Sequence, residues 1–340
     1  MKKLDLKTLI QGIPKAELHL HLEGSFEPEL MFEIAKRNNI PLAYDSLEAL
    51  KQAYKFNNLQ DFLDIYYIGA QVLIHEQDFF ELTWAYLTKV HNQNVVHVEV
   101  FFDPQTHTDR GVAFEVVING IHRALEKAKL ELNVSYKLIM SYLRHLSEDE
   151  AFKTLKESLP FKHWIDGVGL DSSEVGNPPS KFTKVFEASA EEGYKLVAHA
   201  GEEGPVDYIW EALDLLNVVR IDHGNRCLDD DALVERLVEQ KIGLTLCPLS
   251  NVALNVIHKM EDHPVTEMLE RGLLATIHSD DPAYFGGYMN ENYYETAKAL
   301  ELNKTQLMQL AINAFDASWL GQEVKELHKQ KVKSYFSSLN

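Results

Sequence analysis

The first strong pattern in the chain is a strict alternation of leucine with polar residues at positions 18–24, Leu-His-Leu-His-Leu-Glu-Gly. Successive side chains of a β-strand point to opposite faces of the sheet. The three leucines are therefore expected to pack against a layer of helices, while His19, His21 and Glu23 share the other face. Paired imidazoles of this kind suit zinc better than magnesium or calcium. A half-buried strand whose histidines only form hydrogen bonds is the alternative interpretation.

Short apolar runs separated by helical segments continue along most of the chain. The predicted strands are Ala16–Leu22, Val95–Phe101, Val134–Tyr142, Trp164–Leu170, Lys195–His199, Val218–Asp222, Ile242–Cys247 and Leu273–Ser279. Such alternation predicts a parallel sheet wrapped by helices. Eight strands fit a (β/α)8 TIM barrel, which usually takes about 250 residues. A doubly wound sheet is the competing architecture, but it would require a glycine-rich turn after the first strand, and Gly24 alone does not supply one.

The remaining length is assigned to two helical additions within a single domain, residues 1–340. The segment of about 46–93 has apolar residues at helical spacing and predicts several helices without a strand between them. Such an insertion after the first strand would either cap a pocket or simply enlarge the scaffold. A helical tail is predicted from Lys304 to the end.

In a TIM barrel the catalytic groups lie at the carboxyl ends of the strands or just after them. The unusual polar clusters of this chain occur there, at His19 and His21, His199, His223, and the Asp280-Asp281 pair. We therefore expect these side chains to meet at one mouth of the barrel.

Composition narrows the possible partners and compartments. The 340 residues are 45% hydrophobic and 25% charged, with a formal net charge of -19. An acidic surface repels phosphate backbones, so nucleic acid is not expected as a partner. The two cysteines indicate no disulfide framework, and neither a signal peptide nor a membrane-spanning run is expected. A cytoplasmic protein is the default prediction, and the sequence carries no signal for an oligomeric state.

Three imidazoles and one carboxylate, from His19, His21, His199 and Asp280, form a ligand set for one divalent cation with a position left for water. Bound zinc lowers the pKa of such a water to about 7. A second metal in such barrels usually needs a bridging modified lysine near the end of strand four, and Val168–Asp171 contains no lysine. We therefore predict one zinc ion per chain.

The remaining polar residues can supply proton transfer and substrate contacts. His223 is free to act as a base and hold the attacking water, and Glu202 is placed to donate a proton. Asp281 is placed to orient a substrate nitrogen. Each has a simpler alternative: Glu202 as a helix cap, His223 as part of a turn with Gly224, and Asp281 as part of a turn before proline. His199 could likewise be a hydrogen-bonded strand-end residue. Further histidines on or near strands are interpreted as core or supporting groups: His97, His107, His145 and His278.

Five motifs together closely resemble the adenosine/adenine deaminase family. They are HLHLEGS (19–25), VAHAGEEG (197–204), RIDHG (220–224), CPLSN (247–251) and SDDPAYFGGY (279–288). The resemblance implies a zinc-dependent barrel that hydrolyses the exocyclic amine of a 6-aminopurine. Carried over by motif, the four ligands named above hold zinc, Glu202 shuttles a proton to ring N1, and His223 activates or orients the attacking water. Asp281 contacts the imidazole edge of the purine.

Three departures from the nucleoside-specific pattern bear on the substrate. Glu23 stands where adenosine deaminases usually carry an aspartate that meets the ribose, and Phe101 stands where they usually carry arginine. After strand four, Ser173 and Glu174 stand near the position of a glycine whose amide approaches the purine, and are assigned to substrate binding with Glu23. These changes resemble the adenine deaminase branch.

The expected reaction is therefore adenine and water to hypoxanthine and ammonia, in purine salvage, on a small-molecule purine. Adenosine deamination and deamination of N6-substituted adenines are the alternative activities. A non-catalytic purine-binding barrel would be expected to lack one of the catalytic residues, and none is missing. A phosphotriesterase- or amide-cleaving barrel is disfavoured by the absent bridging lysine.

Overall fold

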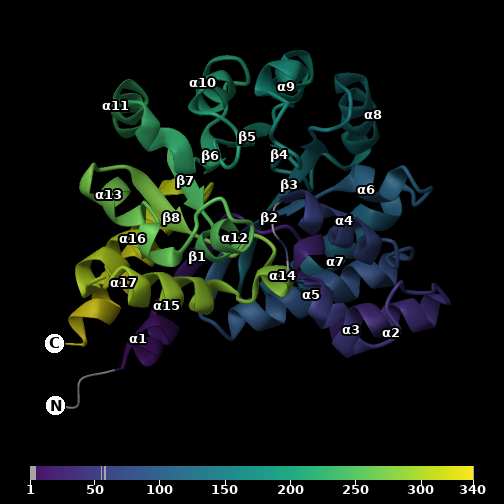
Figure 1. The fold of residues 1–340 in the computed structure, drawn as a ribbon, viewed down its shortest axis with the longest axis horizontal. Helices are drawn as coiled ribbons and strands as arrows, with labels where there is room; N and C mark the ends of the chain where they lie inside the picture. The colour runs from purple at the N-terminus through teal and green to yellow at the C-terminus, as the bar shows by residue number, and fades with distance from the viewer. Residues whose placement is uncertain (1–4, 55, 57–58, 340) are drawn as a thin grey trace.

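Eight parallel strands follow one another around a barrel in chain order (Figure 1). This computed structural model describes residues 5–54, 56 and 59–339, and the strand count refers to those residues. The strands are β1 (Lys15–Glu17), β2 (Val95–Phe102), β3 (Ser135–Leu143), β4 (Gly167–Asp171), β5 (Lys195–Ala200), β6 (Arg220–His223), β7 (Gly243–Leu246) and β8 (Leu274–Ile277). The predicted barrel is confirmed.

The chain after β1 completes the ring. The amide of Asp280 donates to the carbonyl of His19 at 3.1 Å, and the amide of His21 donates to the carbonyl of Asp280 at 3.0 Å. On the other side, Phe101 at the end of β2 donates to Leu20 at 2.8 Å. Residues 18–22 are thus held on both sides by single bridges rather than by a regular ladder, which is why β1 is shorter than the predicted strand Ala16–Leu22.

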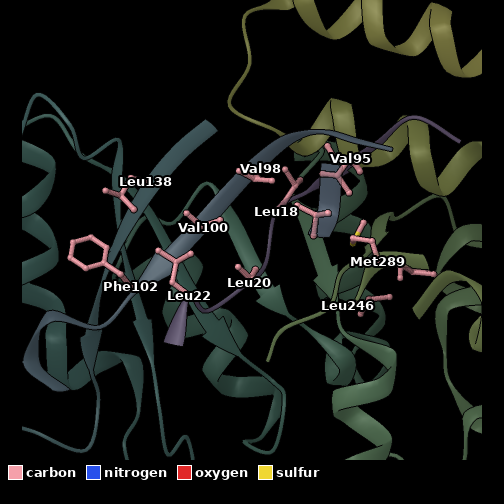
Figure 2. Close-up of a cluster of buried hydrophobic side chains, with 14 of the residues drawn as sticks. Leu18, Leu20, Leu22, Val95, Val98, Val100, Phe102, Leu138, Leu246 and Met289 are labelled. Carbon is pink, nitrogen blue, oxygen red and sulfur yellow. The ribbon is translucent and has the colours of Figure 1, made fainter. Parts of the chain in front are cut away.

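The predicted alternation of faces is present in this segment. Leu18, Leu20 and Leu22 are fully buried in the main hydrophobic core. Figure 2 shows them beside Val98 and Val100 of β2. Burial of a leucine side chain contributes about 1.5–3 kcal/mol, so the apolar face anchors the segment and directs the histidines to the barrel interior.

Helices surround the strands (Figure 1). They are α1 (Leu6–Gly12), α2 (Pro28–Asn38), α3 (Leu47–Ala53), α4 (Leu59–Ala70), α5 (Glu76–His91), α6 (Pro104–Thr108), α7 (Phe114–Glu131), α8 (Glu148–Ser158), α9 (Thr183–Glu191), α10 (Val206–Asp214), α11 (Asp231–Gln240), α12 (Pro248–Ala253), α13 (Val265–Glu270), α14 (Pro282–Phe285), α15 (Met289–Ala299), α16 (Lys304–Ala317) and α17 (Gln322–Ser337). Among the described residues, no helix is both long and apolar enough to cross a membrane.

The two helical additions lie where the sequence placed them. Helices α3, α4 and α5 fall within the predicted insertion of about 46–93, although residues 55, 57 and 58 of that segment are outside the described residues. The predicted tail consists of α16 and α17. It packs back toward the start of the chain, since the Tyr335 hydroxyl donates to the carbonyl of Leu9 at 2.8 Å.

A buried ion pair supports the barrel interior below the mouth. Arg220 of β6 is 1% exposed and binds the Glu99 carboxylate of β2. Burial pushes the pKa of Glu99 upward, but the Arg220 guanidinium and His97 hold it at about 2. Arg220 also lies 3.3 Å from Asp222 through Nε. The pair therefore joins opposite parts of the sheet through charges that have no access to water.

Replacing Arg220 with leucine should destabilise the fold strongly, because Glu99 would remain buried without its cation. Loss of one partner of such a pair costs about 3–5 kcal/mol in the free energy of unfolding. Urea titration would measure the change. Arg226→Leu removes an exposed arginine paired with Asp229 and should change stability by about 0.5 kcal/mol or less. Equal effects of the two substitutions would contradict the role assigned to Arg220.

Candidate metal and catalytic site

Four predicted ligands from three separated parts of the chain meet at the mouth of the barrel. One ligand atom from each of His19, His21, His199 and Asp280 lies within 4.8 Å of all the others. His19 Nε2 is 3.2 Å from Asp280 Oδ1, and the Nε2 atoms of His21 and His199 are 3.1 Å apart. All four side chains are buried. The structure thus brings together the complete set that the sequence selected.

The hydrogen bonds of His19 leave its Nε2 free to bind a cation. Its Nδ1 lies 2.8 Å from the Thr245 hydroxyl, which donates its own proton to Asp222 at 2.9 Å. Thr245 must therefore accept from His19 Nδ1–H, which leaves Nε2 as the nitrogen that faces a cation. Burial lowers the pKa of His19, but the neighbouring Asp280 carboxylate outweighs burial and raises it. This Nε2 has no hydrogen-bond partner among the described residues. A partner that fixes the outer nitrogen is typical of metal-binding histidines.

The other two imidazoles are also in the form that binds metal. Burial lowers the pKa of His21 to about 4 and lowers the pKa of His199 well below its usual range. Both rings are therefore neutral at pH 7, as metal ligation requires. Their facing nitrogens, 3.1 Å apart, and the nearby Asp280 carboxylate fit a shared cation.

Glu202 and His223 lie beside this cluster. His223 Nε2 is 3.5 Å from Glu202 Oε2 and 3.8 Å from Asp280 Oδ2. Burial, followed by the charge of Asp280, raises the pKa of Glu202 well above its usual range, which favours the protonated form of this carboxyl. Glu202 is therefore able to act as an acid.

His223 is oriented by the backbone and by a neighbouring amide. Its φ of 62° is unusual for a residue with a side chain, and Asp280 has the same φ. Asn251 Nδ2 lies 3.4 Å from His223 Nδ1, while Asn251 Oδ1 faces His263. With Nδ1 accepting from the amide, Nε2 of His223 carries the ring proton. This arrangement favours orientation of a water over removal of its proton.

Glu174 holds the loop that carries Glu202. Its carboxylate accepts four backbone N–H bonds of 2.7–3.0 Å, from Gly201, Glu202, Glu203 and Gly204. Ser173 lies at the surface, 3.4 Å from Gln60. Neither residue is among the described residues that line the cavity, and the substrate contact expected of Ser173 and Glu174 stays a prediction. The carboxylate of Glu174 is already used by the backbone, which makes it a positioning residue.

Asp281 has room to reach the cavity because Gly24, which packs against its side chain, has no Cβ atom. A Cβ atom at Gly24 would lie 1.9 Å from Asp281 Oδ1. Glu23, one residue earlier, is buried and does not line the cavity. Its Oε1 accepts from His107 Nε2 at 2.8 Å and from the amide of Asp103 at 3.3 Å. The predicted residue Glu23 therefore lies behind the cavity wall, next to Asp103.

The cavity over the cluster is narrow, with a volume of about 40 Å³. Its lining consists of His21, Leu59, Phe62, Leu63, Tyr66, Tyr67, Asp103, Asp171, Ser172, His199, Glu202, His223, Leu254, Asp280 and Asp281. Five of these residues belong to α4, so the helical insertion forms part of the cavity wall. Phe101, predicted to replace an arginine, stacks on His21 with ring centroids 5.0 Å apart.

Sequence reasoning missed two groups that the strand-end rule would have found. Asp103 comes directly after β2, and Asp171 is the last residue of β4. Asp222 lies within the RIDHG motif but was not predicted to have a role, and Thr245 lies in none of the five motifs; the Thr245 hydroxyl contacts the ligand His19 and donates to Asp222. The other histidines lie outside the four-ligand group: His278, for example, accepts from the Leu18 amide at 3.0 Å.

The family model for adenosine deaminase matches residues 14–335. The chain belongs to the adenosine deaminase family. Among its relatives in this family is an adenine deaminase of Acinetobacter baylyi, 59% identical over 94% of this chain and 96% of the relative. Another, from Hahella chejuensis, is 58% identical over 94% of this chain and 96% of its own length.

Two solved structures of relatives match the whole fold. The crystal structure of an adenine deaminase from Arthrobacter aurescens is 47% identical, with a TM-score of 0.94 over 96% of this chain and 99% of that one. An amidohydrolase from Burkholderia ambifaria with bound zinc is 25% identical, with a TM-score of 0.90 over 99% of this chain and 94% of that one.

Replacing Glu174 with alanine should loosen the loop that carries Glu202. Four N–H groups would lose a charged acceptor, and hydrogen bonds to charged groups contribute about 1.5–3 kcal/mol each. Amide hydrogen exchange at residues 201–204 should accelerate by at least about tenfold, with a fall in kcat. The exposed Glu187→Ala on α9 is the matched control and should change neither quantity. Unchanged exchange in the Glu174 variant would refute the positioning role.

Proposed function

We propose that this protein hydrolyses adenine to hypoxanthine and ammonia. The observation that carries the proposal is the similarity to adenine deaminases over almost the full length of both chains, at 55–59% identity. The match to the Arthrobacter aurescens adenine deaminase structure supports it. The site has the acid, the polar histidine and the ligand cluster that hydrolytic removal of an amine requires.

The proposed cofactor is one zinc ion held by His19, His21, His199 and Asp280. Three imidazoles and a carboxylate are a typical zinc donor set. The zinc-containing relative from Burkholderia ambifaria is consistent with this choice of metal. A zinc ion held by these residues would supply a nucleophile at neutral pH by lowering the pKa of a coordinated water to about 7.

Proton transfer and water orientation are assigned to Glu202 and His223, which lie beside the ligand cluster. Glu202, whose raised pKa favours the protonated form, donates its proton to ring N1 as water oxygen adds to C6. His223 orients the attacking water through Nε2–H, and Asp281 contacts the imidazole edge of the purine. The C6–N bond then breaks, and the amine leaves as ammonia with one hydrogen from water. The other hydrogen from water returns to the Glu202 carboxylate, while the proton that Glu202 donated remains on N1 of hypoxanthine. General acid catalysis of this kind typically contributes about 10²–10⁴ in rate.

The free base is preferred to the nucleoside because the pocket is small and closed by acidic groups. Glu23 packs against the segment that carries Asp103, and α4 covers the opening. A ribose on N9 would have to displace these groups. Adenosine and N6-substituted adenines remain the alternative substrates.

Adenine, adenosine and N6-methyladenine should be compared as substrates of the zinc-loaded protein. We expect kcat/KM for adenine to exceed the value for adenosine by at least about 100-fold, because a nucleoside both lacks the N9–H donor and brings a bulky sugar. Ammonia release would be measured for each. Faster turnover of adenosine would overturn the free-base assignment, and faster turnover of N6-methyladenine would shift the activity to substituted adenines.

His19→Ala should remove the metal. The remaining two imidazoles and one carboxylate bind zinc much more weakly than four ligands do, so zinc content after dialysis should fall from about one per chain to well below that. Metal content by atomic emission is the measurement. His258→Ala changes an exposed histidine outside the cluster and should keep its zinc. Stoichiometric zinc in the His19 variant would show that the ligand assignment is wrong.

A further inference from the structure

The proposed reaction does not use the two carboxyl groups that Asp103 and Asp171 present to the cavity. Asp103 follows β2, and Asp171 ends β4, so both lie at the same mouth as the ligand cluster. They are 3% and 2% exposed, and both line the cavity. One oxygen from each lies within 4.8 Å of the other and of a His21 ring nitrogen.

The carboxyl group of Asp103 is held in place with one oxygen left unpaired. Its Oδ2 accepts the Tyr66 hydroxyl of α4 at 2.9 Å. Its backbone amide donates to Glu23 at 3.3 Å, which fixes the position of the residue. Its Oδ1 is buried and meets no N–H or hydroxyl donor among the described residues, and burial, followed by the charge of Asp171, raises the pKa of Asp103 well above its usual range. A buried acceptor without a donor is costly, so Oδ1 is arranged to meet a group that arrives with the ligand.

Among the described residues of the cavity wall, no positively charged side chain serves as this donor. The described residues that line the cavity include no lysine or arginine. His21 separates the two parts of the site, because its Nε2 faces the ligand cluster while its Nδ1 lies 3.4 Å from Asp171 Oδ2. The two aspartates thus lie one imidazole ring away from the metal cluster, along the wall of the same cavity.

A purine placed for the proposed reaction presents a suitable donor on that side. With C6 at the metal cluster and N1 at Glu202, the N3–C4–N9 edge points away from the metal. In the free base this edge carries N9–H, whereas in a nucleoside N9 is bonded to the sugar.

We propose that Asp103 Oδ1 accepts a hydrogen bond from N9–H of the free base and thereby selects it over 9-substituted purines. This assignment rests on the proposed adenine deamination and its substrate orientation. Tyr66 fixes the carboxyl group from the α4 side, and Glu23 fixes its backbone. Glu23 therefore acts on the substrate through Asp103 rather than by direct contact. A site built to bind an N–H group rejects an analogue without it far more strongly than an apolar pocket rejects an extra methyl group.

The wild-type protein tests the need for N9–H without any substitution. Purine and 9-methylpurine carry no amine to be hydrolysed and would be compared as inhibitors of adenine turnover. Purine should inhibit at least about 100-fold more strongly than 9-methylpurine. If both inhibit equally, the proposal is wrong. If adenine is not turned over at all, the proposed function fails instead, and calorimetric binding of the two probes still decides the role of N9–H.

Variants separate the hydrogen bond from simple crowding. Asp103→Asn keeps an oxygen for Tyr66 but presents an amide N–H to the substrate, so the KM for adenine should rise by at least about 100-fold with zinc content unchanged. Asp103→Ala removes both the acceptor and its bulk, and the preference for purine over 9-methylpurine should fall below about tenfold. Asp109→Asn, at the exposed end of α6, is the matched control and should behave as wild type.

Two results would overturn the proposal. One is a preference for purine that persists in Asp103→Ala, which would mean that shape alone excludes the methyl group. The other is a second zinc ion per chain that disappears in Asp103→Asn, which would assign Asp103, Asp171 and His21 to a cation instead.

Discussion

The seam between Leu20 and Asp280 is the interaction on which the rest of the structure depends. Backbone hydrogen bonds join the chain after β1 to β2 on one side and to the chain after β8 on the other. The same few residues close the barrel and carry three of the four clustered ligands. Because side chains alternate along the segment, packing of the leucines outward leaves the histidines no direction except inward. The same backbone contacts therefore close the barrel and place the ligand side chains.

Buried polar groups below the ligand cluster hold the strands of this end of the barrel in position. Asp222 accepts from Thr245 and lies next to Arg220, which in turn binds Glu99 on the far side of the sheet. Each charge in this chain of contacts is buried, and each has an opposite charge or a hydrogen-bond donor beside it. Such networks are costly when broken, which restrains the orientation of His19 at their upper end.

The barrel and the central site could be predicted from sequence because both follow simple periodic rules. Strand period and strand-end chemistry placed His19, His21, His199, His223 and Asp280 at one mouth, and the structure brings them together there. The same rule applied to β2 and β4 would have included Asp103 and Asp171. The role of Glu174 was not accessible in this way, because its partners are backbone amides 27–30 residues away whose approach depends on loop shape. The length of β1 could not be predicted either. It depends on isolated bridges to Phe101 and Asp280, and the residue pattern of one strand does not reveal its pairing partners.

Aromatic contacts connect the helical insertion to the segment that follows Asp281. Phe62 of α4 lies with its ring centroid 5.3 Å from that of Tyr284 and 4.7 Å from that of Phe285, both in α14. Helix α14 begins immediately after Asp281. The contacts between these rings are apolar, so separating the rings would break no ion pair between them. The cover of the cavity is therefore held by apolar ring contacts, whereas the ligands beneath it are held by the backbone hydrogen bonds that close the barrel.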